Sequence, residues 1–310
     1  MINGMINVYK ERGYTSHDVV ARLRGILGQK KIGHTGTLDP DAEGVLPVCL
    51  GTATKLSDMI TASRKTYQAV IRLGITTDTQ DMSGNVLTEK EVTCSPNEFR
   101  QAAASFVGSY DQIPPMYSAI KVGGKKLYQL ARAGKTIDRK PRHVSIFRID
   151  VESVDLPLAV MTIHCSKGTY IRTLCHDIGE RLGCGACMQA LVRTQTGIFT
   201  LQDAVRLEEI ETLAGADRKA LLELIIPVER ILGDLAPVYS GSRQTDVLLH
   251  NGARLEGRQL SCPGKEPEDG QLFRAYDSSH SFIAVYQYIE AQDSFRNYKM
   301  FYRQEELRSK

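Results

Sequence analysis

The sequence predicts an α+β fold divided into two domains. Helical and strand patterns both occur, but they do not alternate strictly as in doubly wound α/β proteins. The 310 residues correspond to roughly two domains of about 150 residues each. A segment with two prolines and a glycine, residues 226–237, separates helical patterns from a turn-rich, strand-like region. We therefore expect one domain over residues 1–235 and a small β domain over residues 236–310.

Helices are predicted from apolar spacing and from capping residues. In the first helix, apolar residues recur at helical spacing between Ser16, in the N-cap position, and Gly28, which ends it. Ser95 and Glu98 have the spacing of a capping box and predict a second helix. Further helices are predicted for residues 125–134, 173–183, 206–213 and 218–225.

Strands are predicted from alternation of apolar residues. The pattern over residues 65–74 places Tyr67, Ala69, Ile71 and Leu73 on one face of a strand. The preceding segment, residues 30–44, is rich in glycine and turn residues and predicts a loop. Other strands are predicted for residues 45–54, 144–155 and 159–172, and in the small domain for residues 273–277, 281–288 and 297–303.

Composition indicates a cytoplasmic globular protein. Hydrophobic residues make up 42% and charged residues 24% of the chain, which argues against disorder and against a coiled coil. No apolar run approaches the roughly 18 residues of a membrane span, and the N-terminus lacks a secretory pattern. Seven cysteines cannot all pair, so reduced thiols are expected.

Cys184 and Cys187 have the spacing of metal ligands. A structural zinc site needs four ligands, and the sequence offers no second pair at such a spacing. Buried or surface thiols are therefore the better interpretation, and no metal or other cofactor is expected.

Positive charge is concentrated in one part of the chain. Residues 121–148 contain nine Lys or Arg and one acid, so this segment carries +8. The whole chain carries +3, which leaves −5 for the rest. Tyr128 and His143 lie among these cations, a composition that suits binding of nucleic acid. A solvated surface segment would have the same composition, so the charge alone leaves both interpretations open.

The segment that includes Asp39 is the most informative part of the sequence. It has neither the spacing of a phosphate-binding loop nor that of a dinucleotide-binding turn. It presents a single carboxylate, Asp39, which Pro40 biases toward an extended conformation. Such an aspartate fits nucleophilic or electrostatic work, but a tight Asp-Pro turn without function is the better explanation of the local pattern alone.

Five ordered segments together are similar to the TruB-type tRNA pseudouridine synthases. The stretch KKIGHTGTLDPDAEGVLPVCLGTATK resembles the active-site motif of that family. KTYQAVIRLG resembles its second block, and DQIPPMYSAIKVGGKKLYQLARAG with RKPRHV resembles its RNA-binding insertion, about residues 112–148. CSKGTYIRTLCHDIGERLGCGA and HNGARLEG resemble two later blocks, so the similarity covers roughly residues 3–260.

The resemblance implies a catalytic domain with a mixed β-sheet and a small C-terminal domain of the PUA type. It also implies an isomerase that converts uridine 55, in the T-arm loop of tRNA, to pseudouridine after flipping the base, without a cofactor. The expected partner is tRNA, with no membrane and no obligate protein partner, so the enzyme is expected to be a monomer. Whether the aspartate attacks C1′ or a glycal intermediate forms is left open.

Each expected site residue is carried over from the matching motif. Asp39 corresponds to the catalytic aspartate, and Arg172 to the arginine that pairs with it. Tyr67 corresponds to the aromatic residue that stacks on the target base and can help to remove the C5 proton. The further substrate-binding residues are Tyr170 and Leu191 in the base pocket, His34 against the RNA, and Lys125, Lys126 and Arg132 on phosphates.

Two departures from the family pattern affect these expectations. The family often has two adjacent arginines where this chain has Val192 and Arg193, which affects the pocket near Leu191. Residues 240–310 contain ten basic and ten acidic residues, so a strong electrostatic role for the C-terminal domain is not expected.

The sequence is compatible with three rival functions. The first is a tRNA-binding folding helper in which catalysis is secondary or lost. The second is a synthase that acts on a different RNA, and the third is a metal-dependent hydrolase that uses Cys184 and Cys187.

Overall fold

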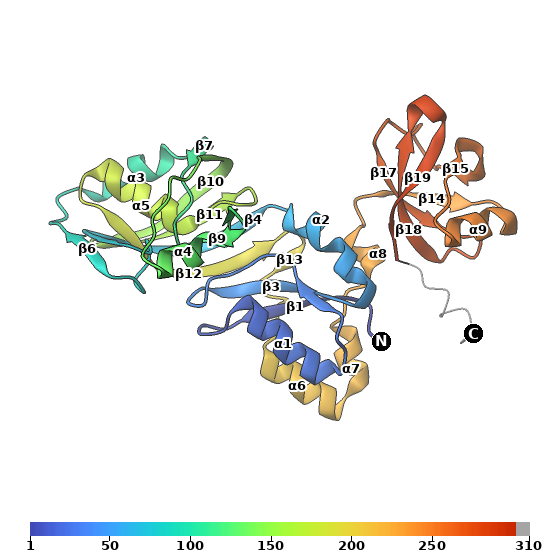
Figure 1. The fold of residues 1–310 in the computed structure, drawn as a ribbon, viewed down its shortest axis with the longest axis horizontal. Coiled ribbons are helices and arrows are strands. Elements are labelled where there is room, and N and C mark those ends of the chain that lie inside the picture. Colours follow the sequence, from blue (N-terminus) through green and yellow to red (C-terminus); the bar gives the residue numbers. More distant parts are fainter. Residues whose placement is uncertain (302–310) are drawn as a thin grey trace.

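The computed structural model describes residues 1–301 and contains two main β-sheets flanked by helices (Figure 1). Within these residues the larger sheet has nine strands in the order β1-β3-β12-β4-β11-β10-β7, with β2 paired to β3 and β13 to β12. Strands β3 and β12 are parallel and the other pairs are antiparallel, so the predicted mixed sheet is confirmed. Its strands are β1 (Gly4–Lys10), β2 (Ile32–His34), β3 (Glu43–Leu50), β4 (Lys65–Leu73), β7 (Gly108–Gln112), β10 (Arg142–Asp155), β11 (Leu158–Cys165), β12 (Ala186–Thr196) and β13 (Phe199–Thr200).

Helices cover the larger sheet in two groups. Near one end, α3 (Pro96–Ala104) and α5 (Ile171–Leu182) pack on β10 and β12 and bury a core that includes Phe99 and Ile178. Near the other end, α1 (Ser16–Leu27) and α6 (Leu207–Ala216) pack against β1 and β3 (Figure 1). Shorter elements are η1 (Gly51–Leu56), α2 (Ser57–Thr61), α7 (Arg218–Glu223) and α8 (Val228–Ile231).

The register in the middle of the larger sheet brings three strands together. The parallel pairing of β3 and β12 places Gly44 beside Arg193. The antiparallel pairing of β12 and β4 places the same Arg193 opposite Tyr67. Gly44 has φ +101°, and a Cβ there would lie 2.3 Å from the Arg193 carbonyl oxygen. Only glycine allows this close approach, so Gly44 sets how the segment before β3 joins the sheet.

Residues 236–300 contribute the second sheet. Its strands are β14 (Ala236–Ser240), β15 (Leu255–Glu256), β16 (Leu260–Ser261), β17 (Leu272–Tyr276), β18 (Phe282–Ile289) and β19 (Ser294–Met300). The helix α9 (Arg243–His250) and the 3₁₀ turns η2 (Gly257–Gln259) and η3 (Glu290–Gln292) lie between them. Apolar residues of α8, β3 and β18 share one core, and Tyr276 donates a hydrogen bond of 2.8 Å to Glu229. The second sheet is thus packed onto the first part of the chain.

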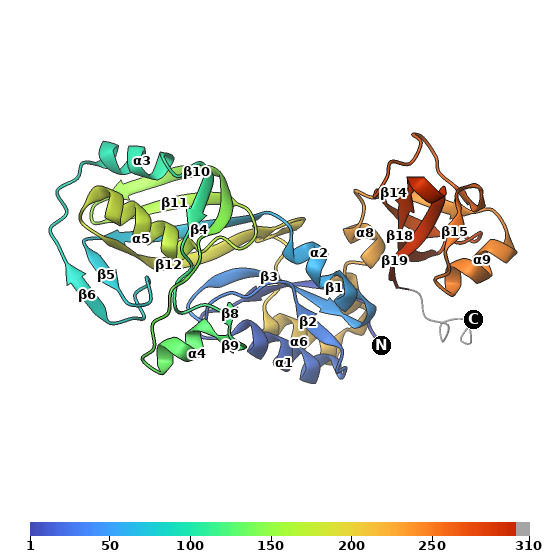
Figure 2. The ribbon, with the colours of Figure 1, turned by 45° about the horizontal axis from the view of Figure 1, so that its top comes forward.

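Two small hairpins project from the larger sheet (Figure 2). One consists of β5 (Ile75–Thr77) and β6 (Val86–Glu89), which follow β4. The other lies between β7 and β10 and contains β8 (Lys121–Val122), β9 (Lys125–Lys126) and the helix α4 (Leu127–Arg132). This second hairpin and α4 contain part of the basic segment identified in the sequence.

The predicted elements occur with several corrections. The strand predicted over residues 159–172 ends at Cys165, and residues 171–172 begin α5. The strand predicted over residues 45–54 ends at Leu50, where η1 follows. Helix α1 is capped by Thr15 rather than Ser16, because Thr15 and Asp18 form a reciprocal capping box. The expected loop over residues 30–44 contains the short strand β2, which pairs with β3. The turn-rich C-terminal region contains α9, which was not predicted. The capping box of Ser95 and Glu98 is confirmed.

Among residues 1–301, no helix combines the length and the apolar character that crossing a membrane requires.

We predict opposite effects of Gly→Ala at two helical glycines. A Cβ on Gly179, in α5, would lie 2.2 Å from the Ala186 backbone nitrogen, so Gly179→Ala should lower the free energy of unfolding by about 1–3 kcal/mol. A Cβ on Gly25, in α1, meets open space, so Gly25→Ala should raise it by about 0.5–1 kcal/mol. Urea denaturation of both variants measures the difference. Equal stability of Gly179→Ala and wild type would contradict the tight packing of α5 on β12.

Candidate active site

The loop between β2 and β3, residues 35–42, is tied to its surroundings at three points, and we call it the Asp39 loop. The Thr35 hydroxyl donates to the Pro47 carbonyl at 3.1 Å, and the Leu38 N–H donates to the Ser16 hydroxyl at 2.9 Å. The Lys10 ammonium donates to the Ala42 carbonyl at 2.5 Å. These bonds come from β1, α1 and β3, so several elements fix the position of Asp39.

Asp39 forms an ion pair with Arg172 at the start of α5. The distance from Arg172 Nε to Asp39 Oδ2 is 3.0 Å. The Asp39 side chain is 41% exposed, whereas that of Arg172 is only 5% exposed. The pair therefore presents a reachable carboxylate on a buried cation. This is the pairing that the sequence predicted for Asp39 and Arg172.

Arg172 is held by more than Asp39. Its Nη1 donates to the Thr79 carbonyl at 2.9 Å and lies 3.4 Å from Asp81 Oδ2. Its Nη2 donates to the Tyr117 carbonyl at 2.8 Å. A planar guanidinium can make such contacts in several directions at once, whereas a lysine could not. The orientation of Arg172 toward Asp39 is therefore determined by its whole surroundings.

Asp81, the second carboxylate on Arg172, was not among the residues predicted from the sequence. One of its oxygens accepts from the Thr79 hydroxyl at 2.6 Å and the Ser83 hydroxyl at 2.5 Å. The preceding residue, Gln80, has φ +63°, and its side chain accepts a bond of 2.7 Å from Thr173. Residues 78–85 are rich in turn residues, a local pattern that indicates a turn and nothing more. The role of Asp81 depends on the docking of that turn against α5 and β12, which no local pattern reveals.

One side of the site is apolar. Leu191 on β12 and Leu38 in the Asp39 loop belong to one buried cluster, against which Tyr67 on β4 packs. Tyr170 caps α5, and its backbone is held in both directions by Gln112, which accepts from Tyr170 N–H at 2.7 Å and donates to its carbonyl at 2.9 Å. The structure thus brings the predicted Tyr67 and Tyr170 close enough to Asp39 for its charge to act on them, and places Leu191 in the cluster that includes Leu38 of the same loop.

The remaining predicted residues lie at the edges of this arrangement. His34 ends β2, is half-buried, and accepts a bond of 3.4 Å from the Gly36 N–H. Burial lowers the pKa of His34, so its imidazole is neutral at physiological pH. Lys125, Lys126 and Arg132 lie on β9 and α4, outside the sheet. Lys126 and Arg132 both face the ring of Tyr128, at 5.5 and 5.6 Å from its centre.

The site carries an excess of buried positive charge. Lys10, Lys65, Arg172 and Arg193 are at most 6% exposed, and the acids that face Arg172 are Asp39 and Asp81. Burial raises the pKa of Asp39, and the Arg172 guanidinium offsets part of that effect. Burial also lowers the pKa of both Lys10 and Lys65 to about 8. A site of this charge favours an anionic carboxylate and a polyanionic ligand.

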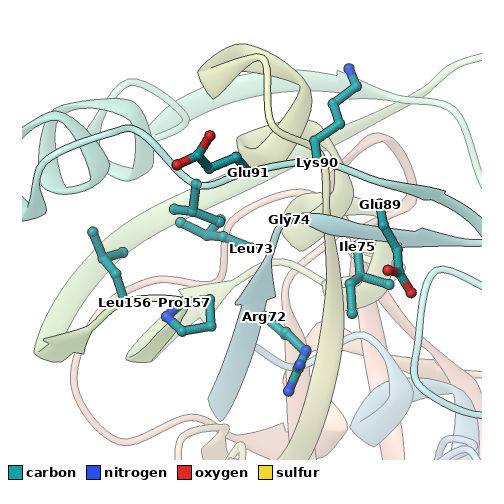
Figure 3. A pocket seen from close by; sticks show the side chains of 10 residues that line it. Arg72, Leu73, Gly74, Ile75, Glu89, Lys90, Glu91, Leu156 and Pro157 are labelled. Atoms are coloured by element: carbon teal, nitrogen blue, oxygen red, sulfur yellow. The ribbon is translucent and has the colours of Figure 1, made fainter.

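A cavity of about 580 Å³ lies elsewhere, at the far end of β4 (Figure 3). Arg72, Glu89, Lys90 and Pro157 are among the residues that line it. Arg72 is five residues from Tyr67 along the strand, which corresponds to roughly 17 Å. The charged side chains around the cavity point in different directions (Figure 3). They do not converge on one point as the groups around Asp39 do.

Cys184 and Cys187, which have the spacing of metal ligands in the sequence, belong to no group of metal ligands among the described residues. Within residues 1–301, no three His, Cys, Asp or Glu side chains are grouped in a way that could hold a metal ion. Cys184 and Cys187 are both buried, and burial raises the pKa of Cys187 to about 11. At neutral pH this thiol is protonated.

Two family models match consecutive parts of the chain. Residues 24–171 match the TruB family pseudouridylate synthase (N terminal domain). Residues 172–233 match the tRNA pseudouridylate synthase B C-terminal domain. The first match contains Asp39 and Tyr67, and the second begins at Arg172.

Similar proteins extend the match over most of the chain. A tRNA pseudouridine synthase B of Lachnoclostridium phytofermentans is 49% identical over 97% of this chain and 100% of its own length. The one from Ralstonia nicotianae is 48% identical and covers 86% of this chain and 84% of its own. A chain in the crystal structure of a Cbf5-Nop10-Gar1 complex is 26% identical with a TM-score of 0.75, covering 97% of this chain and 86% of that chain.

We predict that Lys10 makes stability depend on pH in the alkaline range. Its pKa is about 8 in the folded protein and about 10.4 in an unfolded chain, so between these values the unfolded state binds more protons. The free energy of unfolding contributed by Lys10 therefore rises with pH. The free energy of unfolding of wild type minus that of Lys10→Met should increase between about pH 7.5 and 9.5, as measured by urea denaturation. Lys65 is present in both proteins and cancels; a constant difference would contradict the prediction.

Proposed function

The chain belongs to the TruB family of tRNA pseudouridine synthases, and from that premise we propose that it acts on uridine 55 in the T-arm loop of tRNA. The observation that carries the proposal is the Asp39–Arg172 ion pair of 3.0 Å, in which the carboxylate is exposed and the guanidinium is buried. A tRNA substrate is compatible with a cytoplasmic enzyme that works as a monomer.

The reaction rearranges atoms within one nucleotide. The bond between N1 of uracil and C1′ of ribose breaks, the base turns, and C5 bonds to C1′ before losing its proton. C1′ becomes electron-poor when its bond to N1 breaks, as in glycoside hydrolysis, and a carboxylate can attack or stabilise it there. Asp39 takes this role, and Arg172 keeps it ionised and oriented. Both the covalent route and the glycal route place Asp39 at the ribose.

The apolar side of the site receives the flipped base. Tyr67 provides a face for stacking, while Tyr170 and Leu191 complete the pocket around it. Extruding a stacked uridine costs a few kcal/mol, which contacts with the RNA must offset. His34, neutral at the edge of the Asp39 loop, lies against the RNA rather than in the chemical step.

The insertion, residues 112–148, supplies the compensating phosphate contacts. Its cations Lys125, Lys126 and Arg132 lie together on β9 and α4. The insertion is also bonded to the site at its base, because Arg172 donates to the Tyr117 carbonyl and Gln112 holds Tyr170. Binding of RNA by the insertion can therefore support the residues that surround the target base. Such contacts recognise the shape of an RNA rather than its base edges.

We predict that Asp39→Asn abolishes tritium release from a T-arm stem-loop that carries [5-³H]uridine. Removal of a nucleophile should lower the rate by at least about 1,000-fold. The matched control is Asp41→Asn, because Asp41 is 52% exposed and, among the residues that the structure describes, forms an ion pair only with the surface residue Arg12. This control should retain wild-type release.

The experiment distinguishes a wrong reaction from a wrong role for Asp39. If well-folded wild type binds the stem-loop without releasing tritium, the proposed reaction is wrong and the folding helper becomes the better explanation. If Asp39→Asn releases tritium as fast as wild type, the reaction is right and the role of Asp39 is wrong.

We predict that reversing the charge of Lys125, Lys126 and Arg132 to Glu weakens tRNA binding and flattens its salt dependence. Each lost phosphate contact reduces the slope of log K against log salt by roughly 0.7–0.9. Filter binding between about 50 and 200 mM salt measures the slope. A control with the same charge change, in Arg218, Lys219 and Arg230 on α7 and α8, should alter the slope less. An unchanged slope in the insertion variant would exclude these phosphate contacts.

A further inference from the structure

Arg193 is a buried cation whose hydrogen bonds are incomplete. It lies in the middle of β12 and is 1% exposed. Its Nε donates to the Val45 carbonyl at 2.7 Å, whereas its Nη2 is buried and has no hydrogen-bond partner. Burying a charge without full pairing costs several kcal/mol. Stability therefore does not explain the presence of an arginine at this position.

The surroundings of Arg193 make the burial more costly still. Burial lowers the pKa of Lys10 and that of Lys65, and the nearby Arg193 charge lowers each further, although Asp39, Glu43 and Asp41 act in the opposite direction on Lys10. An apolar residue here would avoid these costs. An arginine at a buried position next to other cations is better explained by a role in the reaction.

Two groups of the active site lie against the guanidinium. Tyr67 is directly opposite Arg193 in the pairing of β4 with β12, so both side chains emerge on the same face. The two side chains are close enough for the Arg193 charge to act on the Tyr67 phenol. On the other side, a Cβ on Gly36 of the Asp39 loop would lie 3.7 Å from Arg193 Nη1. Arg193 thus lies between the loop that carries Asp39 and the ring expected to stack on the base.

We propose that Arg193 is a positioning residue, whose guanidinium holds the Tyr67 hydroxyl where it accepts the proton that leaves C5 of the target base. This inference rests on the proposed function. After C5 has bonded to C1′, the C5–H bond breaks and the proton passes to the Tyr67 oxygen. The C5–H electron pair restores the C5=C6 double bond, the C6=N1 electron pair returns to N1, and N1 takes a proton from water. Tyr67 then returns its proton to solvent.

The charges around Tyr67 agree with this role. Burial raises the pKa of Tyr67, and the Arg193 guanidinium lowers it. The other titratable groups that face the phenol are Asp39 from the loop and Cys165 from β11. Asp39 raises the pKa of Tyr67, and Cys165 is a neutral thiol because burial raises its own pKa to about 11. Arg193 is thus the group among them that favours the ionised phenol.

The test is a double-mutant cycle on single-turnover tritium release. Arg193→Met should lower the rate by about 10- to 100-fold, while tRNA affinity stays within about twofold of wild type. Tyr67→Phe should also be slow, and adding Arg193→Met to it should cause no further loss. Arg72→Met is the matched control, because Arg72 also has a buried Nε without a partner but lies at the far end of β4. It should release tritium as wild type does.

A pH profile separates positioning from a structural role. The phenolate is the active form, so the rate rises with pH up to the pKa of Tyr67. Removing the Arg193 charge raises that pKa, so the rising limb should move to higher pH and the loss should shrink as pH increases. Arg193→Lys retains the charge and should keep the limb near its wild-type position. Losses that add in the double variant, or a limb that does not move, would overturn the proposal.

One further measurement does not depend on activity. Tyrosines labelled with ¹³C at Cζ report their ionisation by NMR, and the Tyr67 signal is the one missing from Tyr67→Phe. Arg193→Met should move the titration of this signal to higher pH. If wild type releases no tritium, the proposed function is wrong. The NMR titration still tests the contact between Arg193 and Tyr67 in that case, and a Tyr67 titration that Arg193→Met leaves unchanged would exclude this contact.

Discussion

The ion pair of Asp39 with Arg172 determines how the surrounding structure is arranged. Arg172 is almost fully buried, and removing a guanidinium from water costs several kcal/mol unless its donors are paired. Two carboxylates and two backbone carbonyls supply that pairing. They come from the Asp39 loop, the turn after β5 and the insertion, so three segments far apart in the sequence meet at one side chain. Loss of any of them would leave part of a buried charge unpaired.

The excess of buried cations at the site fits a substrate that is itself a polyanion. Lys10 stabilises the Asp39 loop through backbone carbonyls, and Arg193 lies beneath the same loop. Neither is needed for the fold in the way that an apolar side chain would be, and each carries a desolvation cost. This cost is consistent with the function that we propose, in which an anionic carboxylate must persist beside a flipped base. Phosphates of bound RNA add negative charge from outside.

The two sheets contribute differently to the candidate active site. The larger sheet carries the residues that meet at Asp39, and its register across β3, β12 and β4 decides which of them are neighbours. The second sheet packs on α8 through an apolar core and a hydrogen bond from Tyr276 to Glu229. Residues 240–310, which contain most of this sheet, have no net charge in the sequence, so shape rather than charge is the property that this part of the chain can offer to an RNA.

Local sequence determined much about this protein. Capping residues and apolar periodicity predicted α3 and the face of β4 that bears Tyr67, because helix caps and alternation depend on neighbours within a few residues. The motif around Asp39 and the later motif with Arg172 predicted the family and the pair that the structure brings to 3.0 Å. Composition located the basic insertion.

Tertiary structure alone decided the rest of the site. Asp81 and Arg193 have no local signature, because their roles come from the docking of a turn against α5 and from the register between β12 and β4. Gln112 likewise acts on Tyr170 across 58 positions of the chain. Burial and pairing between distant segments fix the charges of such groups. These properties arise only when the chain has folded, so no pattern of neighbouring residues could have specified them.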